Sequence, residues 1–335
     1  YGTEDGKFKY MGGIRYTLKR KPFKAIGFQY KNDLVQPGLY EGYFKDEGWI
    51  VTLFKRNPSD KLCKVESQKY YYDAIYSFGL SFRLQYLKNH YSSVGNLNFE
   101  YYSNDTRTET NEDLNTSEIW LGARYSSGEK FIEKKYKRYS LGSDLPVFQL
   151  NLIKGLKNFW DGEFNYFKVA LRLSDKLKLF PYGHMTYAIE AGNVFGTIPY
   201  PLLYVHRGNE SYAFDYTAFN LMNHYEFISD RYASLCAEHH FDGFAFRKIP
   251  LIRKLDWREI VSIRILFGHL SQENKEILTD PSIVSNIRST PYVETGVGLE
   301  NILKLIRIDA LWRLTYLDIP DASHLGIRVS MQLLF

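Results

Sequence analysis

The sequence predicts an all-β protein, namely a transmembrane antiparallel up-and-down β-barrel of about 14–16 strands. Three observations lead to this fold class: apolar and polar residues alternate, the alternating segments run to about ten residues, and aromatic residues are abundant. The 335-residue chain contains 28 Tyr, 23 Phe and 5 Trp. Tyr and Trp gather where one end of the side chain is apolar and the other is wet, as at the two rims of a barrel in a bilayer.

The alternation is clearest in the last segment, 325–335, which ends on an aromatic residue. Its polar face includes Arg328. Its apolar face consists of Leu325, Ile327, Val329, Met331, Leu333 and Phe335. As expected for outer-membrane barrels as a class, we interpret this face as the signal that barrel assembly machinery recognises. The same period-two pattern occurs at 118–125, 167–174, 261–267 and 306–316.

Arginine and lysine residues lie at the centre of the polar faces, which is typical of the hydrated lumen of a membrane barrel. A soluble sandwich also alternates, but its strands are usually only about five or six residues long. No segment approaches the roughly 18 consecutive apolar residues of a spanning helix. We therefore expect the protein in the outer membrane of a Gram-negative bacterium.

The net charge of +5 is spread among apolar residues without forming a patch, which disfavours a nucleic-acid partner. The two cysteines, Cys63 and Cys236, allow one disulfide at most. The sequence opens at Tyr1 without a signal peptide, although outer-membrane proteins are exported. We expect residues 1–335 to be one barrel domain, the C-terminal part of a longer precursor.

An insertion at 196–218 interrupts the alternation. Its prolines break strand pairing, and its apolar content is high for a solvated connector. Strand directions counted back from the C-terminus place it on the periplasmic side, opposite the loop 269–290. It is a plug inside the barrel, a docking loop for a periplasmic partner, or an ordered loop that closes the barrel base. The residues assigned to a plug or docking role are Pro199, Tyr200, Pro201, Leu203, Tyr204, His206 and Asn209.

Ligand-type residues gather between 224 and 240, on the two predicted arms of a hairpin with a tight turn at 229–231. They are His224, Glu226, Asp230, Glu238, His239 and His240. Strand alternation puts His239 and His240 on opposite faces, so we favour lumen-lining side chains over a metal site. The sequence contains no nucleophile elbow, zinc-protease motif or phosphate loop. We therefore predict no catalytic, cofactor or metal site, and a protein that is not an enzyme.

Several stretches are similar to one known family. They include Glu190-Ala-Gly-Asn-Val-Phe-Gly, Phe219-Asn-Leu-Met-Asn223, Glu226-Phe-Ile-Ser-Asp-Arg231 and Arg307-Ile-Asp-Ala-Leu-Trp-Arg-Leu314. Over most of 20–335 the chain resembles the barrel of a Bacteroidota outer-membrane family of unassigned function. In that family a carboxypeptidase-like regulatory domain precedes the barrel. The stretch 191–196 is also similar to barrels of the BamA type, which insert other barrels into the membrane.

The resemblance implies a non-enzymatic scaffold or accessory in envelope or outer-membrane protein assembly or secretion. A diffusion channel or transporter is the alternative for a barrel of this size with a charged lumen, and a membrane-embedded hydrolase is a third. The expected partners are outer-membrane lipid and lipopolysaccharide, the barrel assembly machinery and other envelope proteins. We expect no nucleic acid and no cofactor.

Removing Phe335, or replacing Val329 with Asp, should reduce the amount of assembled barrel in the outer membrane, because either change damages the apolar face of the last segment. Heat-modifiability on a gel reports the assembled form. Normal membrane levels and normal heat-modifiability of both variants would refute the recognition signal.

Overall fold

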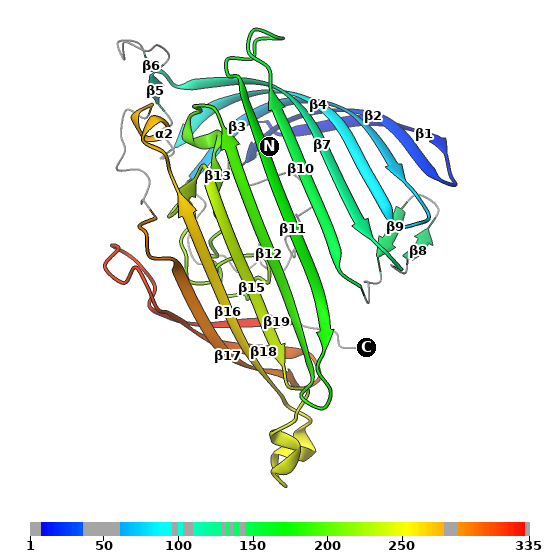
Figure 1. Cartoon of the computed structure of the whole chain (residues 1–335), viewed down its shortest axis with the longest axis vertical. Coiled ribbons are helices and arrows are strands. Elements are labelled where there is room, and N and C mark those ends of the chain that lie inside the picture. The colour runs from blue at the N-terminus through cyan, green and yellow to red at the C-terminus, as the bar shows by residue number, and fades with distance from the viewer. Residues whose placement is uncertain are drawn as a thin grey trace.

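A computed structural model describes residues 8–35, 61–95, 100–102, 110–128, 131–134, 137–140, 145–277 and 287–331. They form an all-β protein built on one antiparallel sheet of 13 strands in chain order (Figure 1). The predicted all-β antiparallel meander is therefore confirmed. Its strands are β1 (Tyr10–Lys19), β2 (Phe23–Val35), β3 (Lys61–Ile75), β4 (Leu80–Gly95), β7 (Asp113–Ser126), β10 (Val147–Gly155), β11 (Tyr166–Lys178), β12 (His184–Phe195), β15 (Arg231–His240), β16 (Arg258–His269), β17 (Tyr292–Ile302), β18 (Ile306–Arg313) and β19 (Leu325–Met331).

The other described elements are short and lie in the connections between these strands. Three further strand pairs form there. The short strands are β5 (Tyr101–Tyr102), β6 (Thr110–Asn111), β8 (Phe131–Lys134), β9 (Lys137–Ser140), β13 (Tyr204–Val205) and β14 (Ile228–Ser229). The helices are η1 (Tyr200–Leu202), η2 (Phe246–Lys248), η3 (Ile252–Leu255) and α2 (Gln272–Glu276).

The two faces of the sheet differ in the way that the alternation predicts, because successive side chains of a strand point to opposite faces. In β16, Ile263 and Phe267 are 38% and 54% exposed, whereas Arg264 between them is 1% exposed. In β19, Ile327 is 62% exposed and Arg328 only 3%. In these strands the outer face is thus apolar and exposed, and the inner face carries buried arginines.

The connections alternate between two ends of the sheet. The insertion end carries the long connection 196–230 between β12 and β15, the helix α2 after β16, and the connection 314–324. The turn end carries 179–183 and 241–257, the latter with η2 and η3. Figure 1 shows α2 and these two short helices at opposite ends of the strands.

The position of the long connection corrects the sequence analysis. The Ile198 amide donates a hydrogen bond to Oδ1 of Asn274 in α2 (2.9 Å). Residues 196–218 therefore lie at the same end as the loop 269–290, not at the opposite end. The predicted hairpin with a turn at 229–231 does not form, because β15 alone crosses the sheet there. The chain therefore crosses the sheet once less here than predicted. Segments that precede this point, including 196–218, consequently lie at the end opposite to the predicted one.

The described sheet is open, in contrast to the predicted closed barrel, and has 13 strands instead of about 14–16. Because neighbouring strands are antiparallel and their number is odd, β1 and β19 run in the same direction. The free edge of β19 is occupied at one point: the Val329 amide donates to the Tyr212 carbonyl, and the Phe214 amide donates to the Val329 carbonyl, both at 3.0 Å. Closure by direct pairing of β1 with β19 would be parallel.

Residues 196–230 pack against the inner face of the sheet, and we call them the inner segment. The largest buried apolar cluster joins this segment to β3, β7, β10 and β11. From the inner segment it includes Ile198, Tyr200, Leu202, Leu203, Tyr204, Val205, Tyr225 and Ile228, and from the sheet Cys63, Leu114, Ile153, Tyr166 and Ala170. The core therefore lies on the concave side of the sheet, between the strands and one of their own connections.

Candidate functional site

The candidate functional site is the contact between the inner segment and the inner face of β15–β19. Figure 1 shows the inner segment behind β12 and β15, on the side toward which the sheet curves. Its two prolines shape its start: Pro199 is the N-cap of η1, and Pro201 lies in the first turn, where a missing amide costs no hydrogen bond. β13 then pairs with β14, so the ends of the inner segment lie side by side.

All seven residues assigned to a plug or docking role are buried. The Tyr204 hydroxyl donates to the Val169 carbonyl of β11 (2.8 Å), and Nε2 of His206 lies 2.8 Å from Oγ of Ser229. Burial lowers the pKa of His206 to about 3, so its imidazole is neutral at physiological pH. The plug, docking and base-closing roles of this segment stay predictions.

Asn209 organises the tip of the inner segment. Its side-chain amide donates to the Ala213 carbonyl (2.8 Å) and to Oδ1 of Asn220 (2.7 Å), and its own Oδ1 accepts from the Ser211 amide (2.9 Å). The sequence indicates only a turn at Asn209. In the structure its side chain holds residues up to eleven positions apart, so the tip has a defined shape.

Two arginines of the sheet contact an aromatic ring of the inner segment. The guanidinium carbons of Arg264 in β16 and Arg307 in β18 lie 4.9 and 4.1 Å from the centroid of the Phe214 ring. Both arginines are almost fully buried. A cation is attracted to the face of an aromatic ring, and more strongly where water is excluded. Phe214 therefore anchors the inner segment to the wall of the sheet.

Glu238 of β15 balances these charges. Its carboxylate accepts hydrogen bonds from Arg264 (2.7 Å) and Arg307 (2.8 Å), and Arg307 also makes two bonds of 2.8 Å to Asp309. Buried charges are tolerated when they are paired and hydrogen-bonded. Removing one member of a buried pair typically costs about 3–5 kcal/mol. These two arginines and two carboxylates therefore form one cooperative cluster.

Two further arginines bind the inner segment directly. Arg313 of β18 donates to the Glu226 carboxylate (2.6 Å), and Arg328 of β19 donates to the Asn220 carbonyl (2.8 Å). Both are 3% exposed. We expected the arginines of the polar faces to line a hydrated lumen. The structure differs for these two residues, because their side chains are buried against the inner segment.

The carboxylate of Glu294 in β17 binds backbone amides at the tip of the inner segment. Its carboxylate accepts from the amides of Asn220 (2.7 Å) and Leu221 (2.9 Å). Hydrogen bonds to an ionised carboxylate are stronger than neutral ones. Sequence reasoning did not identify Glu294 or the arginines as binding residues. Their only sequence signal is their place on the polar faces of alternating segments, which many other residues share.

The ligand-type residues at 224–240 are divided between the inner segment and β15. Among the described residues, no three or more His, Cys, Asp or Glu side chains are arranged to hold a metal ion. His240 instead lies 3.2 Å from Glu300, and its ring stacks on that of His184 with centroids 4.5 Å apart. His184 lies 3.0 Å from Asp242. The sequence did not indicate these two histidine–carboxylate pairs near the turn end.

The proposed assembly signal lies on the exposed outer face of β19. Its described members are Leu325, Ile327, Val329 and Met331. Leu333 and Phe335 lie outside the described residues. The recognition role of this face stays a prediction.

Two outer-membrane β-barrel proteins are among the solved structures that match. CdiB from Acinetobacter baumannii is 11% identical with a TM-score of 0.38, and the match covers 96% of this chain and 56% of CdiB. LpxR from Salmonella typhimurium is 8% identical with a TM-score of 0.26, covering 96% of this chain and 85% of LpxR. The chain thus spans little more than half the length of CdiB.

Other comparisons add little. No curated protein sequence matches the chain. In the part of the chain that the structure describes, none of the helices is long and apolar enough to cross a membrane.

The prediction that the chain is not an enzyme is corrected by these comparisons. LpxR, one of the matching structures, is an outer-membrane enzyme. The prediction rested on the lack of known sequence motifs. Active sites are defined by the geometry of a few side chains, which a motif search can miss.

A family model matches residues 64–278, which is more than half of the chain. It describes the C-terminal domain of DUF5686, a family of unknown function. The Bacteroidota origin and the carboxypeptidase-like domain that the resemblance implies stay predictions. The chain belongs to the DUF5686 C-terminal domain family.

Proposed function

We propose that the protein is a β-barrel of the outer membrane whose lumen is filled by the inner segment, and that it serves as a scaffold or accessory in envelope assembly or secretion. The observation that supports a membrane location is the exposed apolar outer face of strands whose inner face holds buried arginines. The anchoring of the inner segment supports a filled barrel over an open channel.

The membrane location rests on the distribution of side chains. In water, an outer face of half-exposed Leu, Ile and Val would be an aggregation hazard. In a bilayer the same face is solvated by lipid, while polar residues face the interior of the barrel. The strand length also fits, since β16 has 12 residues and a tilted strand crosses the bilayer in about 9–11.

The edges of the sheet support a role in assembly. Lipid offers no hydrogen bonds, so the backbone edges of β1 and β19 must be paired in a membrane. They pair either with each other in parallel, or with a further strand antiparallel to both, which would give the even strand number of bacterial barrels. Strand edges are also places where segments of other proteins add to a sheet.

The inner segment supports a filled barrel. It packs with Cys63 of β3 in the largest apolar cluster and pairs with Val329 of β19 at the last strand, so it spans the inner face. Four buried arginines and Glu294 hold it in place. An open diffusion channel needs a continuous aqueous path, and a segment fixed in this way obstructs it.

A diffusion channel is the second candidate, and one feature favours it. A hollow of about 290 Å³ next to Tyr216 has charged residues in its lining, among them Arg172, Lys176 and Glu238. Charged side chains around a hollow are expected along a path for polar solutes. A channel gated by the inner segment would use this hollow.

Replacing Glu294 with Ala should release the tip of the inner segment and raise the single-channel conductance of the purified protein, because the amides of Asn220 and Leu221 lose their acceptor. A hydrogen bond to a charged group contributes about 1.5–3 kcal/mol, so we expect at least about tenfold faster hydrogen exchange at these amides. Planar-bilayer recordings and exchange mass spectrometry measure the two effects.

The matched control is Glu300→Ala. Glu300 is also buried on β17, but it contacts His240 and not the inner segment. This variant should keep the low conductance of the unmodified protein. If the unmodified protein already conducts as freely as Glu294→Ala, the inner segment does not obstruct the lumen and the channel replaces the filled barrel.

Replacing Leu171 with Arg should reduce the folded barrel in the outer membrane. Leu171 is 53% exposed, midway along β11 on the outer face. At such a site in a soluble protein the change would be nearly neutral, within about 0.5 kcal/mol. On a lipid-facing strand it costs about 2–4 kcal/mol. Leu171→Phe is the control, and equal amounts of the two folded variants in washed membranes would argue against a lipid-facing surface.

A further inference from the structure

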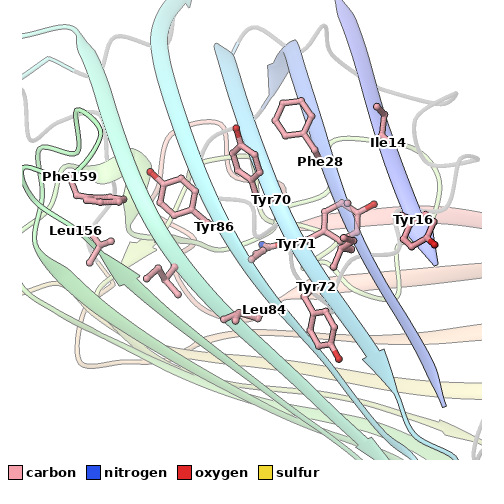
Figure 2. Close-up of a pocket in the computed structure, with 14 residues that line it drawn as sticks. Ile14, Tyr16, Phe28, Tyr70, Tyr71, Tyr72, Leu84, Tyr86, Leu156 and Phe159 are labelled. Carbon is pink, nitrogen blue, oxygen red and sulfur yellow. The ribbon is translucent and has the colours of Figure 1, made fainter. Parts of the chain in front are cut away.

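An apolar groove of about 990 Å³ crosses the outer face of β1–β4 and β7. Figure 2 shows Ile14, Phe28, Tyr70, Tyr86 and Phe159 in a row across neighbouring strands. The side chains that line the groove are apolar or aromatic except for one glutamine, and none is charged. Ligand sites usually have volumes of about 300–1,000 Å³, so this groove is large enough for an extended organic molecule.

The connection between β10 and β11 walls the groove at the insertion end. Leu156 and Phe159 of this connection are among the lining residues. The rings of Phe159 and Trp160 pack edge-on against Tyr86 of β4, with centroids 5.9 and 5.3 Å apart. Such aromatic pairs add about 0.5–1.5 kcal/mol beyond the area that they bury. The wall is therefore a packed part of the protein.

The polar border of the groove lies directly beyond this wall. Lys88 is two residues after Tyr86 on the same face of β4, and its Nζ lies 2.6 Å from the Asp161 carboxylate. The Tyr86 hydroxyl lies 2.9 Å from Oγ of Ser117. An apolar groove that ends at an exposed ion pair has the polarity of an amphiphile with one long apolar part.

We propose that this groove binds one acyl chain of a membrane lipid, with the lipid headgroup at the Lys88–Asp161 end. The inference rests on the proposed function, because it needs the outer face to lie in the membrane. The groove is continuous with the exposed apolar face of the sheet, and in a bilayer the molecules next to that face are acyl chains. The residues that line the groove can contact an acyl chain along its length, and they contribute few groups that need a hydrogen-bond partner.

A second hollow on the same face shows what sets the groove apart. It measures about 350 Å³, and all of its lining residues, such as Tyr125, Phe148 and Leu171, belong to strands. Among the described residues, no connection contributes to its lining. A lipid chain there would exchange as freely as at any flat surface, whereas a chain in the walled groove has contacts along its length and at its end.

The test compares lipid retention by groove-filling and control variants. Ile26→Trp and Leu84→Trp each place a large side chain in the groove, and Val297→Trp places one on the outer face of β17, away from it. The full-length protein is extracted from its own membranes in mild detergent, and native mass spectrometry counts bound lipids. The unmodified protein and Val297→Trp should each retain about one lipid, and the two groove variants should retain at least about tenfold less.

The outcomes separate the inference from the proposed function. If the unmodified protein is absent from the membrane fraction, the proposed function fails. If it is membrane-embedded but retains detergent only, or if Ile26→Trp and Leu84→Trp retain as much lipid as Val297→Trp, the groove is not a lipid site while the barrel proposal stands. Recovery of a bound polypeptide instead of a lipid would also overturn the inference.

Discussion

The structure depends on buried charges on the inner face of the sheet, which pair with one another and also hold the inner segment. Arg264 and Arg307 share Glu238 within the sheet and both contact the Phe214 ring, while Arg313 pairs with Glu226 of the segment. Each charge would be very unfavourable if it were buried alone. The sheet therefore balances Arg264 and Arg307 through its own carboxylates, and the segment balances Arg313 through Glu226.

This charge pairing is coupled to the polarity of the outer face. In β16, β18 and β19 the charged side chains turn inward and exposed apolar side chains turn outward, so the protein carries an exposed apolar surface on the outside of its sheet. A bilayer is the solvent that suits such a surface. The groove near β1 and the aromatic side chains around it belong to the same surface.

The inner segment also links the lumen to the edge of the sheet. The backbones of Tyr212 and Phe214 hydrogen-bond Val329, on the free edge of β19. A single contiguous segment thus packs on the concave side and also contacts this edge. With an odd number of described strands, that edge and the edge of β1 are the places where a further strand can add. In the proposed barrel, the segment that fills the lumen also contacts the edge at which the sheet is completed.

The sequence by itself determined the strands and the polarity of their faces. In β16, β18 and β19 the alternation identifies every inward arginine, because side-chain direction in a strand is a local property with a period of two. The apolar character of 196–218 likewise marks the inner segment as unusual. For these features no knowledge of distant contacts is needed.

Only the tertiary structure decided what those side chains touch. Alternation shows that Arg307 and Glu238 point inward, but they are 69 residues apart, and the strand register decides that they meet. The side of the inner segment was misassigned, because one miscounted crossing among residues 219–230 reverses it. Whether an inward arginine contacts water or the ring of Phe214 depends on where the connection 196–230 packs. That packing is a long-range property, which the local alternation of residues does not determine.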